Sequence, residues 1–164
     1  TQEPDGGWYY QQIDLGFNYR MTELQGALGV SQMSYLDDFV TRRHQLGKRY
    51  DELLKDLPII LPYRNPANYS GFHLYPIQLT ADSGKTRKQV FDSLRAQNIG
   101  VNVHYIPVHT QPYYAKLGFR QGDFPHAERY YAQAISLPLY YDLSEALQDQ
   151  VVDALKIALA QAFA

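Results

Sequence analysis

The sequence contains no cysteine, and it has one tryptophan and two methionines among its 164 residues. Without cysteine the chain forms no disulfide bond and no thiolate metal site, which fits a reducing compartment such as the cytoplasm. The sequence also lacks any apolar run near the roughly 18 to 20 residues that span a bilayer, and its first residues show no signal-peptide pattern. We therefore expect a cytoplasmic protein that does not enter a membrane.

Neither sign of charge dominates, because 15 basic and 17 acidic residues are interspersed and give a net charge of −2. Nucleic-acid-binding proteins usually carry a basic field, since neutralising phosphate supplies much of their affinity. We therefore expect no nucleic-acid partner. Hydrophobic residues make up 45% of the chain, which is enough for a buried core. The 15 tyrosines suit either that core or half-buried surfaces facing a ligand or partner, and both interpretations stay open.

The length of 164 residues predicts one domain, or one small domain with an appendage. The chain opens with TQEPDGGWYYQQ, which has no initiating methionine and no start signal for a helix or strand. Its proline and glycines mark residues 1–21 as loop. We expect the chain to be a fragment of a longer polypeptide.

Two helices are predicted after this loop. Thr22 and Gln25 form a capping box, so the first helix should begin there. Glycines interrupt the apolar run, and we place a break within residues 33–36, giving a short helix and then a long one that Pro58 closes. The following apolar residues recur at roughly helical spacing: Leu24, Leu28, Tyr35, Phe39, Leu46, Tyr50, Leu53 and Leu57.

The next elements are a strand and a helix. Residues 71–79, GFHLYPIQL, predict a strand, and Pro76 places it at a sheet edge or a bulge because proline has no N–H to donate. Thr86 and Gln89 form a second capping box, so a helix should begin there and end near residues 98–100.

Residues 101–106, VNVHYI, predict another strand. Its two-residue period assigns Val101, Val103 and Tyr105 to one face, and the opposite face would carry Asn102, His104 and Ile106. Short helices are predicted at residues 110–118 and 123–134, the second opened by Asp123 and Pro125.

The last elements complete a layered fold. Residues 135–139 predict a short strand, and the final helix should begin near Asp142, where D-x-x-E supplies a cap. Its apolar stripe consists of Leu147, Val151, Leu155 and Leu159. The order of elements indicates an α+β (α/β) fold with a small sheet and helices packed on one side.

The loop GFNYR, residues 16–20, is the strongest candidate site from residue chemistry alone. Arg20 offers a fixed fork of donors suited to phosphate or carboxylate, and Asn18 adds amide donors. The helix that begins after Thr22 points free N–H groups and its positive dipole end the same way. An anion site and a plain local ion pair of Arg20 both remain open.

Two weaker motifs have simpler explanations. Residues 82–86, DSGKT, end like a phosphate-binding P-loop, but Leu79 stands where that pattern needs glycine, so a turn and helix cap fit better. His104 and His109 have no nearby carboxylate companion and match no zinc spacing, so we predict no metal site. Residues 104–109 do leave a strand and enter a loop, where ligand groups often lie, although an ordinary surface histidine fits as well.

The chain resembles the C-terminal part of the DegT/DnrJ/EryC1/StrS family of pyridoxal-phosphate (PLP) sugar aminotransferases in three segments: DLGFNYRMTELQGALGVSQ, VNVHYIPVHTQPYYAKLGF and FPHAERYYAQAISLPLYYDLSEALQDQVVDAL. These segments match in order and spacing over about residues 9–160. HYIPVHTQPYY and GDFPHAERYYAQAISLPL are most similar to the branch that aminates the 4-keto group of a UDP-4-keto-6-deoxy-N-acetyl-hexosamine in pseudaminic acid biosynthesis.

The resemblance implies a fold type I aminotransferase that works as a homodimer with shared active sites. Glutamate would hand its amine to the PLP cofactor, and the pyridoxamine form would then aminate the ketone of the UDP-sugar. Asn18 would contact the cofactor phosphate, bound mainly by the other subunit. Contacts to the nucleotide-sugar substrate would come from Tyr19, Arg20, His104, Tyr105, Ile106 and Pro107.

The same resemblance divides the chain. Residues 1–35 would form an active-site loop and short helix that pack on a missing large domain, and residues 36–164 would form the connecting helix and C-terminal small domain. The family's Schiff-base lysine lies in the large domain, and none of the lysines here, at positions 48, 55, 85, 88, 116 and 156, matches its motif. We therefore expect no catalytic residue in this chain and no activity from it alone.

Two alternatives remain. Some family members are PLP-dependent sugar dehydratases, in which a histidine replaces the Schiff-base lysine, and the deciding residue lies upstream. The other alternative is a stand-alone dimerisation or nucleotide-sugar-binding module without catalysis, which would start with its own methionine and bind UDP-sugar without PLP.

Overall fold

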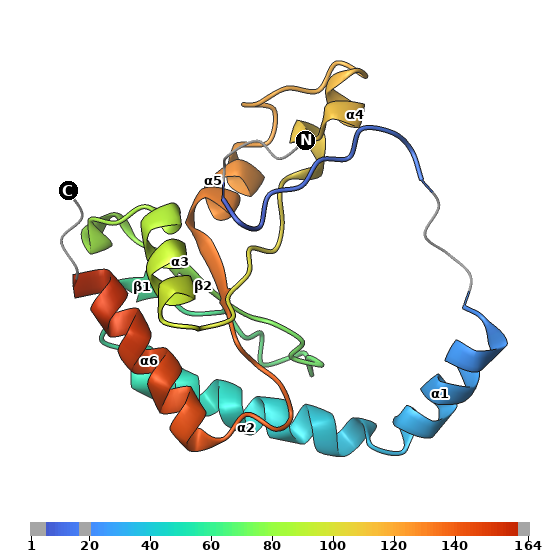
Figure 1. Ribbon diagram of the computed structural model, residues 1–164, viewed down its shortest axis with the longest axis vertical. Helices are drawn as coiled ribbons and strands as arrows, with labels where there is room; N and C mark the ends of the chain where they lie inside the picture. Colours follow the sequence, from blue (N-terminus) through green and yellow to red (C-terminus); the bar gives the residue numbers. More distant parts are fainter. Residues whose placement is uncertain (1–5, 17–20, 161–164) are drawn as a thin grey trace.

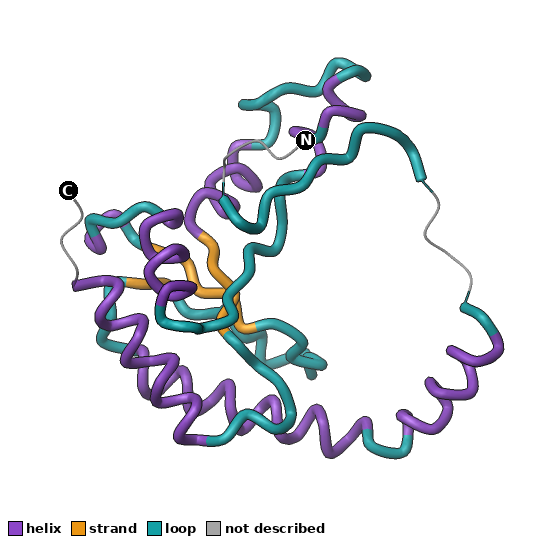
Figure 2. The backbone as a smooth tube through the Cα atoms, viewed as in Figure 1, coloured by secondary structure: helices purple, strands orange, loops and turns teal. Residues whose placement is uncertain are grey.

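The computed structural model describes residues 6–16 and 21–160. Helices surround one small sheet, and a long helix runs along one side of the molecule (Figures 1 and 2). The elements, including two short 3₁₀ helices η1 and η2, follow in this order: α1 (Glu23–Met33), α2 (Leu36–Leu54), β1 (Ile59–Ile60), β2 (Tyr75–Leu79), η1 (Ala81–Ser83), α3 (Arg87–Ala96), η2 (Val108–Thr110), α4 (Pro112–Ala115), α5 (Pro125–Gln133), β3 (Ala134–Leu137) and α6 (Glu145–Ala160).

The sheet is antiparallel, with strand order β1-β2-β3. The strand predicted over residues 71–79 forms at its C-terminal end, but its edge position was wrong, because β2 is the central strand. Pro76 is tolerated there because β1 pairs with residues 78 and 79, so the proline lies beyond the end of that short strand. β3 confirms the strand predicted near residues 135–139 and pairs along β2 from Tyr75 to Gln78.

The strand predicted over residues 101–106 was wrong, because sheet pairing in that stretch is limited to one bridge between Asn102 and Ser136. Asn102 exchanges backbone hydrogen bonds with Ser136, and the ladder ends there; its Oδ1 accepts the N–H of Val103 at 2.8 Å. The predicted alternation therefore holds for the buried Val101 and Val103 and then reverses. Ile106 is buried and Tyr105 is 59% exposed.

Local start signals predicted three helix boundaries correctly. Both capping boxes form, at Thr22 before α1 and at Thr86 before α3, with the hydroxyl of each threonine accepting the N–H three residues later. The break between α1 and α2 falls at residues 34 and 35, inside the predicted interval. Pro125 opens α5 as the first helical residue.

Two predicted caps were wrong. Asp123 does not cap α5, because its Oδ2 accepts the backbone N–H of Arg120 at 3.0 Å instead. The cap of α6 is not Asp142 but Ser144, whose Oγ accepts the N–H of Leu147 at 3.2 Å. The buried stripe of α6 is accordingly wider than predicted and leaves Leu147 43% exposed; its members are Gln148, Val151, Val152, Ala154, Leu155 and Ala158.

One apolar cluster contains side chains of α2, α3, α6 and the sheet. This agrees with the predicted small sheet with helices packed against it. The alternating burial of β2 turns Tyr75, Ile77 and Leu79 into this cluster. Tyr50 of α2 packs against Tyr75 with ring centroids 4.8 Å apart. Its hydroxyl donates to the carbonyl of Pro138 at 3.1 Å, which satisfies the polar tip of a fully buried side chain.

A buried amide connects α2 with α6. The side chain of Gln148 is fully buried, and its Nε2 donates to the carbonyl oxygen of Leu46 at 2.8 Å. Its Oε1 accepts from Nη1 of Arg49 at 3.3 Å, and that guanidinium also pairs with Asp149 at 2.7 Å. Both ends of the amide are therefore satisfied inside the core.

α1 differs from the other long helices, because it buries no side chain. Its apolar residues face solvent, including Leu24 at 85% exposure and Leu28 at 62%. Figure 1 shows α1 and the start of α2 extending away from the sheet. The predicted helical spacing of apolar residues thus reaches the core only in α2, at Leu46 and Tyr50.

We predict that Gln148→Ala lowers the free energy of unfolding by about 2–3 kcal/mol, because it leaves a cavity and removes the partners of two buried bonds. Chemical denaturation measures the change. Gln150→Ala, an exposed glutamine on the same helix, is the matched control and should stay within about 0.5 kcal/mol of the parent chain. Equal losses for the two variants would contradict the assigned role of Gln148.

Candidate functional site

The segment from Asn102 to Gln111 leaves the sheet beside β3 and carries the described part of the predicted site. His104 is its first side chain with a defined polar environment. The His104 Nδ1 lies 2.9 Å from Oγ of Ser136, and its Nε2 lies 3.4 Å from Nδ2 of Asn102. These contacts fix the plane of the imidazole against the end of the sheet.

Partial burial, and then the charge of His73, lowers the pKa of His104 below its ordinary value near 6.5. The ring is therefore neutral at neutral pH and can accept or donate one hydrogen bond at each nitrogen. Such a group suits recognition of a hydroxyl or carbonyl better than neutralisation of a diphosphate.

The three residues after His104 face different surroundings. Tyr105 is exposed, and its ring lies edge-on to that of His104 with centroids 4.7 Å apart; the peptide bond between the two residues is cis. Ile106 and Pro107 are buried. Of the four predicted residues, His104 and Tyr105 reach solvent, whereas Ile106 and Pro107 are buried beside a cavity.

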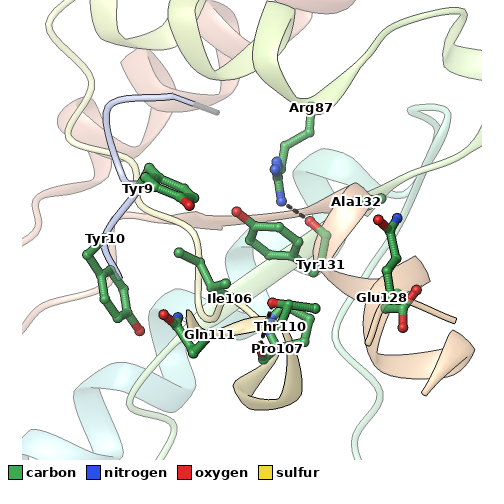
Figure 3. A pocket seen from close by; sticks show the side chains of 11 residues that line it. Tyr9, Tyr10, Arg87, Ile106, Pro107, Thr110, Gln111, Glu128, Tyr131 and Ala132 are labelled. Carbon is green, nitrogen blue, oxygen red and sulfur yellow. Dashed lines mark hydrogen bonds between the residues drawn. The ribbon is translucent and has the colours of Figure 1, made fainter. Parts of the chain in front are cut away.

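A cavity of about 430 Å³ lies on the inner side of this segment (Figure 3). Its lining comes from residues 9 and 10, the loop of residues 106–111, Gln121, α3 and α5. The lining residues are Tyr9, Tyr10, Arg87, Ile106, Pro107, Thr110, Gln111, Gln121, Glu128, Tyr131 and Ala132. The wall therefore combines aromatic faces with amide, hydroxyl and carboxylate groups, a mixture typical of sites for polar organic ligands.

Arg87 is the buried cation of this region. Its guanidinium carbon lies 4.5 Å from the ring centroid of Trp8 and 4.0 Å from that of Tyr131, and its Nη1 donates to the carbonyl of Tyr131. Stacking between two aromatic faces suits the planar, weakly hydrated guanidinium. No sequence motif pointed to Arg87, because its partners lie 79 and 44 positions away.

The prediction that His109 has no carboxylate companion was wrong. His109 is buried, and its Nε2 lies 2.8 Å from Oε1 of Glu128, a residue of α5 that is distant in sequence. The N–H of Gly122, followed by His109, holds the pKa of the Glu128 carboxyl below its usual range. The same oxygen also accepts from the N–H of Phe124 at 3.4 Å, so this cluster fastens the loop before α5.

His104 and His109 do not converge on one site. Over residues 6–16 and 21–160, no group of three or more histidine, aspartate or glutamate side chains is arranged to hold a metal ion. In the same ranges, no helix has both the length and the apolar character needed to cross a membrane. The predicted anion-binding residues Asn18, Tyr19 and Arg20 lie outside the described residues.

No lysine lines this cavity. Five of the six are exposed and Lys85 is half-buried, and none lines the cavity beside Tyr131. A PLP-dependent aminotransferase needs a lysine positioned at the cofactor carbonyl. None of the six lysines is therefore placed at this cavity in the way that such chemistry requires.

An antiparallel sheet packed against three helices, with a polar cavity beside the loop that follows Asn102, characterises a small α+β domain. The model of the DegT/DnrJ/EryC1/StrS aminotransferase family matches residues 2–156. The chain belongs to this family.

Curated relatives agree with the family. The spore coat polysaccharide biosynthesis protein SpsC of Bacillus subtilis is 38% identical over 156 residues, covering 93% of this chain and 40% of SpsC. The UDP-4-amino-4,6-dideoxy-N-acetyl-beta-L-altrosamine transaminase of Helicobacter pylori is 32% identical and covers 87% of this chain and 38% of that protein. The chain thus spans about 40% of the length of these relatives.

Solved structures share the fold. S. venezuelae DesV, solved in complex with a ketimine intermediate, aligns with a TM-score of 0.78 at 29% identity, over 96% of this chain and 42% of DesV. Helicobacter pylori PseC, an aminotransferase of pseudaminic acid biosynthesis, aligns with a TM-score of 0.77 at 28% identity, over 89% of this chain and 39% of PseC. The α+β fold is therefore that of the corresponding part of these aminotransferases.

We predict that the imidazole of His104 titrates below pH 6.5 in an NMR titration of the chain, and that His73→Asn moves its midpoint upward by removing a neighbouring positive charge. His126→Asn is the control, since His126 is exposed on α5, and it should leave the midpoint in place. An unchanged His104 midpoint in His73→Asn would contradict the electrostatic coupling.

Proposed function

We propose that this chain is the C-terminal part of a PLP-dependent aminotransferase that moves an amino group from glutamate to C4 of a UDP-4-keto-6-deoxy-N-acetyl-hexosamine. The observation that carries the proposal is the family match over residues 2–156, nearly the whole chain. The named transaminases among the relatives, at 29–32% identity, support the sugar substrate. The proposal includes pseudaminic acid biosynthesis, the pathway named for PseC, and a cytoplasmic location.

In the proposed whole protein, α1 packs against a domain outside this chain. Because α1 exposes its apolar residues and the chain spans about 40% of its relatives, we assign α1, within residues 1–35, to contacts with the remaining large domain. Residues 6–16 of this range pack on the small domain instead. Residues 36–164 then form the connecting helix and the small domain. In a homodimer the large domains would supply the cofactor site, and each small domain would cover a substrate site at the subunit interface.

Binding roles follow from position in the proposed whole protein. Asn18 is assigned to the cofactor phosphate, and Tyr19 and Arg20 to the nucleotide-sugar. His104 and Tyr105 contact the same substrate through side chains, since both reach solvent at the loop. Ile106 and Pro107 are buried, so their contribution is through the backbone and through the shape of the loop.

The chemistry comes from a group that this chain does not hold alone. Bound PLP supplies an electron sink that lets an amino group leave glutamate and reach a sugar ketone. The residues of this chain bind and orient the sugar, and the neutral His104 ring offers it a hydrogen bond whose geometry Ser136 fixes. Arg20 lowers the cost of bringing the diphosphate into the site.

We predict that the 164-residue chain, incubated with PLP, glutamate and the UDP-keto-sugar, forms no amino-sugar, because none of its lysines matches the catalytic motif. The whole protein should form it under the same conditions, and mass spectrometry of the sugar product measures both. Formation of the amino-sugar by the chain alone would contradict the proposal that the catalytic lysine lies outside this chain. Loss of water from the sugar without amination would make the whole protein a dehydratase.

We predict that Arg20→Ala in the whole protein raises the KM for the UDP-sugar about tenfold or more, since a charge-assisted contact to phosphate is lost, and changes kcat less. Steady-state kinetics with saturating glutamate measure the split. Arg95→Ala, an exposed arginine on α3, is the matched control and should leave both constants unchanged. Normal UDP-sugar binding by Arg20→Ala would remove the assigned role.

A further inference from the structure

Residues 6–16 are neither helix nor strand, yet they are attached to the small domain at two places. We call them the docked segment. Figure 1 shows them running beside α5 and α4 before the chain reaches α1. A segment that belongs to no helix or strand needs contacts with the rest of the domain to stay in place, because fixing each residue costs conformational entropy.

Trp8 supplies the first attachment. It is 7% exposed, and its ring meets Phe91 of α3 edge-on with centroids 4.4 Å apart. Its Nε1 donates to the hydroxyl of Tyr131 on α5 at 3.0 Å, and the guanidinium of Arg87 covers its ring. The indole thus occupies a socket built by two helices, with its polar and aromatic requirements both met.

Gln12 supplies the second attachment. Its backbone N–H donates to Oε1 of the buried Gln111 at 2.7 Å, and its carbonyl accepts the N–H of Tyr113 at 2.9 Å. Nζ of Lys116 reaches the carbonyl of Ile13 at 3.3 Å. The backbone of the docked segment is therefore the partner of the stretch that follows the His104–Pro107 loop.

The loop depends on this partner, because it leaves the sheet early. Sheet pairing around residue 102 is limited to the bridge with Ser136, as described above. Beyond that bridge, Ile106 and Pro107 line the cavity together with Tyr9 and Tyr10. Figure 3 shows Tyr9 and Tyr10 beside Ile106 and Gln111.

We propose that Trp8 is a positioning residue, which holds the docked segment against residues 108–116 and thereby keeps the His104–Pro107 loop in its substrate-binding geometry. Trp8 itself touches no substrate in this scheme. Trp8, the docked segment and residues 108–116 all belong to the described residues, whereas the effect on UDP-sugar binding rests on the proposed function.

Hydrogen exchange in the 164-residue chain tests the positioning claim. Trp8→Ala should speed exchange of the Gln12 and Tyr113 amides about tenfold or more, because opening of the segment exposes both bonds. Trp8→Phe keeps an aromatic ring in the socket and should restore part of the protection. Tyr63→Ala, an 87% exposed aromatic, is the matched control and should change neither amide.

A second variant distinguishes local detachment of the docked segment from a general loss of stability. Gln111→Ala removes the acceptor of the Gln12 N–H while leaving the Trp8 socket intact, and it should loosen the same amides. Exchange of the β2 amides is the internal reference and should stay unchanged in every variant. Unaltered protection of Gln12 and Tyr113 in Trp8→Ala would overturn the proposal.

Kinetics of the whole protein test the consequence. Trp8→Ala should raise the KM for the UDP-sugar about tenfold and leave kcat and the KM for glutamate within about twofold, because misplacement of a binding loop weakens substrate positioning. Trp8→Phe should recover most of the affinity. Faster exchange with an unchanged sugar KM would overturn the link to binding. A whole protein that aminates no sugar would overturn the proposed function, while the exchange rates would still decide the positioning claim.

Discussion

Burial of one face of β2 is the constraint on which the rest of the structure depends. Tyr75, Ile77 and Leu79 alternate toward the helices, and the core they enter collects apolar side chains from α2, α3, α6 and β3. Because neighbouring residues of a strand point to opposite faces, a shift of one position would exchange this face for the half-exposed one. The core fixes the register of β3, and β3 in turn places Ser136 beside His104. The orientation of the His104 ring therefore depends on packing on the far side of the sheet.

What the sequence could predict was local. The capping boxes at Thr22 and Thr86 need contacts within three residues, so their patterns sufficed. The strand predicted over residues 101–106 failed because pairing with β3 ends at the Asn102–Ser136 bridge, an end point that periodicity does not contain. Pro76 was misplaced because its position depends on the length of β1, a strand of two residues. Resemblance identified the family, whereas Trp8, Arg87 and the partner of His109 required contacts between residues far apart in sequence.

The loop, the cavity and the docked segment differ from α1 in how they contact the rest of the chain. The loop, the cavity and the docked segment are fastened by described contacts to α3, α5 and β3. α1, in contrast, presents apolar residues without covering them. A closed core beside one uncovered helix agrees with the proposed contact of α1 with a large domain, because a core is assembled within a domain and surfaces between domains are left open.

The lone indole of the chain has a practical consequence. Trp8 is the sole tryptophan, and it lies where the docked segment meets the helices. Tryptophan emits at shorter wavelength in an apolar socket than in water, so the colour of the intrinsic fluorescence reports on this one junction. The protein thus carries its own optical probe, and detachment of a segment that forms no helix or strand could be followed in real time without attaching a dye.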